Sequence, residues 1–147
     1  MSRSGGVIGA AMMMIASASV SVAAQSLPAA FESPWSDVAP AIVEDRVVAA
    51  GLGLPDERLG RLSARRAAAR SRGEERAETA IHAWADDALA RVSAAPTVAA
   101  DVHRVIDARA EVTRVRALAD GGAVVEIAVP LAALREVSSE RGLPWSR

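Results

Sequence analysis

Two histidines of the chain are each followed, four residues later, by an aspartate. These pairs are His82 with Asp86 and His103 with Asp107. Residues four apart share one face of a helix, so each pair would present an imidazole and a carboxylate together. Both groups are zinc ligands, and a zinc site with an open position uses three protein ligands. A metal site therefore requires the two pairs to converge. Otherwise each pair is an ordinary exposed contact on its own helix.

Other groups that could do chemistry add little to these pairs. Asp87 and Asp101 lie close to them in the sequence. Neighbouring acids such as Asp86 and Asp87 do not face one another on a helix, which disfavours a catalytic pair of carboxyl groups. The chain has no Cys and no Gly-x-Ser-x-Gly motif, which are common settings of a nucleophile. We therefore predict no enzymatic activity, no catalytic residues and no cofactor, with a metal- or small-ligand-binding module as the alternative.

Arginines are concentrated just after residue 57, in a stretch with few acids. Four of them are candidates for contact with an acidic partner: Arg61, Arg65, Arg66 and Arg70. The other interpretation is a solvated helix face, whose charge the following glutamates balance. The formal net charge of the whole chain is −1, so no basic excess indicates nucleic acid as a partner.

Residues 1–24 have the three zones of a secretory signal peptide. Arg3 precedes an apolar stretch from Val7 to Val22, and small residues lead to a cleavage site between Ala24 and Gln25. The apolar stretch is short and rich in Ser and Gly, which disfavours a membrane span. Gln25 stands where a lipoprotein needs Cys, so we expect no lipidation. The mature chain is predicted to be periplasmic or secreted, with no integral membrane span.

The 147 residues, of which 51% are hydrophobic, have room for one small domain. We expect a leader with several prolines over 25–41, an α+β domain over 42–137 and a polar tail over 138–147. Trp145, close to the end of that tail, is either a loose tail residue or an anchor in a partner's groove.

Within the domain, periodicity predicts a strand over 42–52, a long Ala-rich helix over 56–92 and an ambiguous segment, read as a short helix, over 97–108. Strands over 110–118 and 123–129 flank Asp120-Gly121-Gly122, which is typical of a hairpin turn. A short helix over 131–137 follows. The expected fold is a three-stranded, mainly antiparallel sheet with the long helix packed on it.

Three stretches carry a resemblance to a known family. They are Ala49-Ala50-Gly51-Leu52-Gly53, the Ala/Arg run from Ala64 to Ala69, and the segment from Asp120 to Leu131 with its Val-Pro-Leu ending. Together they resemble the LPP-twenty-like outer-membrane lipoprotein domain, which is similar to the N-terminal domain of the flagellar assembly protein FlgT. The resemblance covers about residues 43–135 and lacks the lipidated Cys of that family. It implies a cell-envelope domain that assembles with itself or with other envelope proteins and carries no catalytic residues.

These observations favour an exported, non-enzymatic envelope protein that works by association. We expect the strand over 123–129 to lie at a sheet edge, where it could pair with a second copy. The alternative is a periplasmic module that binds a metal ion or a small ligand through the His and Asp pairs.

Overall fold

The computed structural model describes residues 37–139 and 141–146. The predicted signal peptide and most of the predicted leader lie outside this range. Seven elements follow one another along the chain: β1 (Val38–Val43), β2 (Arg46–Gly53), α1 (Leu62–Arg91), α2 (Pro96–Arg109), β3 (Glu111–Ala117), β4 (Ala123–Pro130) and α3 (Leu131–Val137). The α+β class, the antiparallel sheet and the long helix are confirmed.

The sheet has four strands in the order β1-β2-β4-β3, and every neighbouring pair is antiparallel. The prediction of three strands is therefore wrong. The chain turns back at Glu44 and Asp45, and Glu44 adopts a φ of 56°. This turn contains no Gly, Pro or Asn, and its one typical turn residue, Asp45, is a weak signal by itself. Residues 38–41, expected in the leader, belong to β1.

The strand predicted over 123–129 lies inside the sheet and not at its edge. β4 is hydrogen-bonded to β2 on one side and to β3 on the other. All its residues from Ala123 to Val129 are buried. A strand that is buried on both faces is typically central. The edge-pairing role expected for this segment therefore cannot belong to it.

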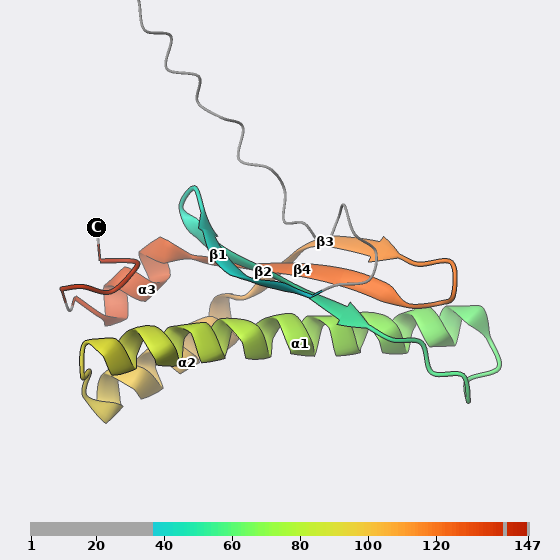
Figure 1. Ribbon diagram of the computed structural model, residues 1–147, viewed down its shortest axis with the longest axis horizontal. Coiled ribbons are helices and arrows are strands. Elements are labelled where there is room, and N and C mark those ends of the chain that lie inside the picture. Colours follow the sequence, from blue (N-terminus) through green and yellow to red (C-terminus); the bar gives the residue numbers. More distant parts are fainter. Residues whose placement is uncertain (1–36, 140, 147) are drawn as a thin grey trace, which may run out of the picture.

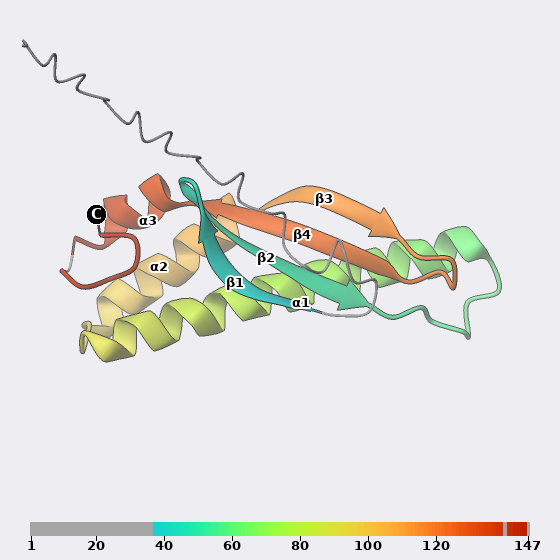
Figure 2. The same cartoon turned by 45° about the horizontal axis from the view of Figure 1, so that its top comes forward.

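Helix α1 lies along one face of the sheet, and α2 runs back beside its C-terminal half (Figures 1 and 2). The buried residues of α1 include a run of small side chains at helical spacing: Ala69, Gly73, Ala77, Ala85 and Ala88. Helix α1 begins at Leu62 rather than at residue 56, and it runs through Gly73 without a break.

Three glycines allow α1 to approach β2 backbone to backbone. A Cβ atom added at Gly53 would lie 1.6 Å from the Ala69 carbonyl oxygen, and one at Gly51 would lie 2.1 Å from that of Gly73. Only Gly fits where two backbones approach this closely. The Gly-x-Gly motif at residues 51–53 is thus the end of β2 and the contact surface for α1.

The segment after α3 folds back onto the domain. Trp145 is fully buried, and its ring centroid lies 5.4 Å from that of Trp84 on α1. The Nε of Arg135 donates a hydrogen bond to the Trp145 carbonyl oxygen. Trp145 therefore belongs to the chain's own core, and the prediction of a loose tail residue or an anchor in a partner is wrong at this position.

Among residues 37–139 and 141–146, no helix has both the length and the apolar character needed to cross a bilayer.

Candidate functional site

The two histidines lie where α2 packs against α1. Each follows directly after a fully buried residue, Ile81 on α1 and Val102 on α2. The apolar side chains fix the rotation of each helix toward the core, so the next residue comes to the rim of the helix–helix interface. The side chain of His82 is 20% exposed and that of His103 is 35% exposed.

The His and Asp pairs converge, but the partners are exchanged between the helices. The Nε2 of His82 lies 2.8 Å from Oδ1 of Asp107 on α2, and the Nε2 of His103 lies 2.6 Å from Oδ1 of Asp86 on α1. The two Nδ1 atoms lie 2.9 Å apart. The convergence that a metal site requires is therefore present, whereas the contacts expected within each helix are replaced by contacts across the interface.

The directions of these hydrogen bonds determine how many protons the two imidazole rings need. A carboxylate only accepts, so both Nε2 atoms must carry a proton when they contact the aspartates. One of the two Nδ1 atoms must carry a third proton, because a hydrogen bond needs one donor. Two neutral imidazoles hold only two protons. All three hydrogen bonds together would therefore require one protonated ring, and the tautomers of His82 and His103 decide which nitrogen donates in each contact.

Glu78 is a further possible metal ligand beside the two histidines. Glu78, His82 and Asp107 each offer a ligand atom, and the three atoms all lie within 4.8 Å of one another. Glu78 lies four residues before His82, so it shares the face of α1 that carries His82 and Asp86. Sequence reasoning treated Glu78 only as a balancing charge, although the spacing 78, 82, 86 was the available signal. We call these five residues the α1–α2 cluster: Glu78, His82, Asp86, His103 and Asp107.

No protein-family model, curated protein or solved structure matches this chain. The resemblance to LPP-twenty-like domains therefore rests on the sequence motifs alone.

The two neighbouring aspartates take no part in the contacts of the cluster given above. Asp101 accepts a hydrogen bond of 2.7 Å from Nη1 of Arg104, within α2. Asp87 is exposed on α1. Asp87 is therefore a matched reference for Asp86, since the two carboxylates are adjacent but only Asp86 contacts a histidine.

The four candidate arginines differ in their surroundings. Arg65 is half-buried and donates from Nε to the Leu59 carbonyl oxygen at 2.5 Å, so it holds the loop before α1. Arg61, Arg66 and Arg70 are exposed. An ion pair further along α1 joins Arg72 to Asp56 at 2.9 Å. The hydrogen bond from Arg72, with a further one from the Arg58 backbone, lowers the pKa of Asp56 below its ordinary value.

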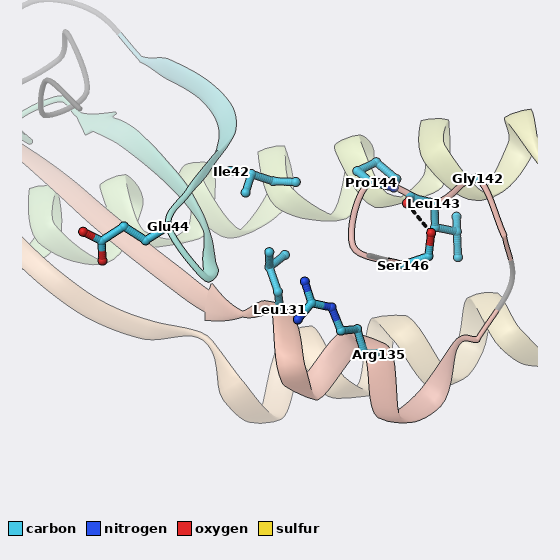
Figure 3. A pocket seen from close by; sticks show the side chains of 8 residues that line it. All are labelled: Ile42, Glu44, Leu131, Arg135, Gly142, Leu143, Pro144 and Ser146. Atoms are coloured by element: carbon cyan, nitrogen blue, oxygen red, sulfur yellow. Dashed lines mark hydrogen bonds between the residues drawn. The ribbon is translucent and has the colours of Figure 1, made fainter. Parts of the chain in front are cut away.

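A pocket of about 690 Å³ lies between the β1–β2 turn, α3 and the C-terminal segment (Figure 3). It contains none of the residues of the α1–α2 cluster. Among the described residues that line it, Arg135 is the cationic one, and its Nε donates a hydrogen bond to the Trp145 carbonyl oxygen. The lining residues are Ile42, Glu44, Leu131, Arg135, Gly142, Leu143, Pro144 and Ser146.

Proposed function

We propose that this chain is an exported, non-enzymatic protein of the cell envelope that binds a divalent transition-metal ion at the α1–α2 cluster. One observation carries the metal-binding part. Ligand atoms of Glu78, His82 and Asp107 lie within 4.8 Å of one another, on two helices that the core holds in place. Three such ligands leave coordination positions for water or a small anion.

The ligand types narrow the class of metal. An imidazole favours zinc and the neighbouring first-row metals over magnesium and calcium, whereas carboxylates suit hard cations. One nitrogen and two carboxylates form a borderline set that suits Zn²⁺, Co²⁺ or Mn²⁺. The chain has no thiol, so the proposal does not extend to thiolate-bound ions such as Cu⁺.

The envelope part of the proposal rests on the sequence of residues 1–24 and on the LPP-twenty-like motifs. It predicts that the protein isolated from the envelope or medium of a bacterial host begins at Gln25. N-terminal sequencing tests this prediction. An intact N-terminus on protein kept in the cytoplasm would contradict it.

The metal-binding part is tested by thermal unfolding with and without Zn²⁺. A ligand that binds only the folded state at one hundred times its Kd adds about 2.7 kcal/mol of stability. We expect a clear rise in Tm for the purified protein and for Asp87→Asn, and none for His82→Gln. An unchanged Tm of the unmodified protein at saturating Zn²⁺ would contradict metal binding. An equal rise in His82→Gln would place the metal elsewhere.

A second candidate is association, with itself or with another envelope protein. The order of the sheet favours it, because β1 and β3 are its outer strands among the described residues, and outer strands are where a partner strand is commonly added. Light scattering on the purified protein tests self-association. A discrete oligomer would support it, and a monomer at every concentration would contradict it.

A further inference from the structure

The α1–α2 cluster offers two different places for a metal ion. One lies between the two Nδ1 atoms, which are 2.9 Å apart. The other lies at Nε2 of His82, which is 2.8 Å from Oδ1 of Asp107, and an oxygen of Glu78 lies within 4.8 Å of a ligand atom of each of these two residues. The two positions use opposite sides of the His82 imidazole ring, so each implies a different set of ligand residues.

The number of available ligands distinguishes the two places. The carboxylates of Asp107 and Asp86 contact the Nε2 atoms, on the far side of each ring from the facing Nδ1 atoms. An ion between the Nδ1 atoms would therefore gain only two ligands from the cluster. An ion at Nε2 of His82 gains three, with Glu78 and Asp107 as the others. Sites with an open position typically use three.

The hydrogen bonds on the other side of His82 also fit the second place. With the ion on Nε2 of His82, the proton that this nitrogen shared with Asp107 is released to solvent, and the proton between the rings stays on Nδ1 of His82, which donates it to Nδ1 of His103. His103 then keeps its proton on Nε2 and donates it to Asp86 at 2.6 Å. In this series of hydrogen bonds, every contact has one donor and one acceptor. The ion takes the place of the proton between His82 and Asp107, so the other contacts are unchanged.

We infer that His82 is the only imidazole ligand, bound through Nε2 together with Glu78 and Asp107, and that His103 and Asp86 are positioning residues. This inference rests on the proposed metal binding. His103 fixes the tautomer of His82, and Asp86 fixes the tautomer of His103. A ligating imidazole commonly donates its other N–H to an acceptor, which orients the ring and raises its basicity. Here a second imidazole with its own carboxylate is that acceptor.

The experiment is two-dimensional ¹⁵N NMR of the imidazole rings, on protein without a histidine tag, before and after addition of Zn²⁺. The chain has two histidines, so a single His103→Gln spectrum assigns both. We expect zinc to shift only Nε2 of His82, with protons on Nδ1 of His82 and Nε2 of His103. Zinc-shifted Nδ1 signals from both rings would overturn the inference while leaving metal binding intact. No shift in either ring would overturn the proposed function as well.

Variants of two adjacent residues, Asp86 and Asp87, test the positioning role of Asp86 separately. Loss of an outer hydrogen-bond partner typically weakens metal binding by about 10–100-fold. We expect Asp86→Asn to weaken Zn²⁺ binding to this extent in a calorimetric titration, and to change the proton position on His103 in the NMR spectrum. Asp87→Asn should do neither. Equal affinities and equal spectra for the two variants would overturn the role of Asp86.

Discussion

Replacement of Gly53 by Ala tests the close approach of α1 to the sheet. The added Cβ would lie 1.6 Å from the Ala69 carbonyl oxygen, whereas an ordinary contact is at least 3.4 Å. The two backbones would have to separate by about 1.8 Å at this point, the difference between those distances. The obstacle is a helix carbonyl, which cannot rotate aside as a flexible side chain could.

The size of the effect follows from the packing that such a shift would disturb. Overpacking of a core typically costs about 1–3 kcal/mol, and sometimes more. Ala69 and Gly73 are both buried against β2 at this place, so moving α1 also opens gaps beside them. We expect Gly53→Ala to lower the free energy of unfolding by about 3 kcal/mol or more. In a domain of this size, that loss lowers Tm by more than about 10 °C.

Urea unfolding followed by circular dichroism measures this loss, with two glycine variants as references. Gly60→Ala places a Cβ with no atom within 4 Å, so its stability should change by less than about 0.5 kcal/mol. Gly73→Ala meets atoms at 2.9 Å but gains about 1 kcal/mol of helix propensity, so its loss should be smaller than that of Gly53→Ala. Equal unfolding midpoints for Gly53→Ala and Gly60→Ala would refute the close approach.

Two further predictions concern the C-terminal segment and an ion pair. Trp145→Ala empties a fully buried site beside Trp84, so it should cost about 3–5 kcal/mol in urea unfolding; a cost below that of a surface substitution would contradict the burial. Arg72→Gln should raise the pKa of Asp56, because it removes the hydrogen bond that lowers it, and carboxyl ¹³C NMR titration measures this. The lowered pKa of Asp56 stabilises the folded state above the unfolded pKa of 3.8, and this contribution is lost as the pH falls below that value. An unchanged titration of Asp56 in Arg72→Gln would contradict the ion pair between Arg72 and Asp56.

Local patterns predicted the parts of the fold that depend on neighbouring residues. The β3–β4 hairpin was predicted from Asp120-Gly121-Gly122 and from the alternation around it, and α3 was predicted at its observed bounds. The buried face of α1 followed from its 3.6-residue period. The turn at Glu44 was missed because it contains no Gly, Pro or Asn, and Asp45 alone is a weak turn signal.

Arrangement in space was beyond the reach of such patterns. Periodicity does not order strands, so β4 was expected at an edge although it is central. The i,i+4 rule describes one helix, so it paired each histidine with the aspartate of its own helix. The exchange of partners depends on how α2 is rotated against α1, which the buried Ile81 and Ile106 help to fix. Trp145 was misplaced for the same reason, since its partner Trp84 is far away in the sequence.

The strand order has a consequence for how the chain reaches this fold. β1–β2 and β3–β4 are local hairpins, whereas β2 and β4 pair over eight residues and thereby join the two hairpins across the connection 54–110 between them. Joining the hairpins is therefore the slow, long-range step, whose entropic cost rises with the length of the closed loop. An ion bound by His82 and Asp107 in the folded protein would link two points inside that connection. Because it stabilises the folded state, it would slow the separation of the two hairpins on unfolding.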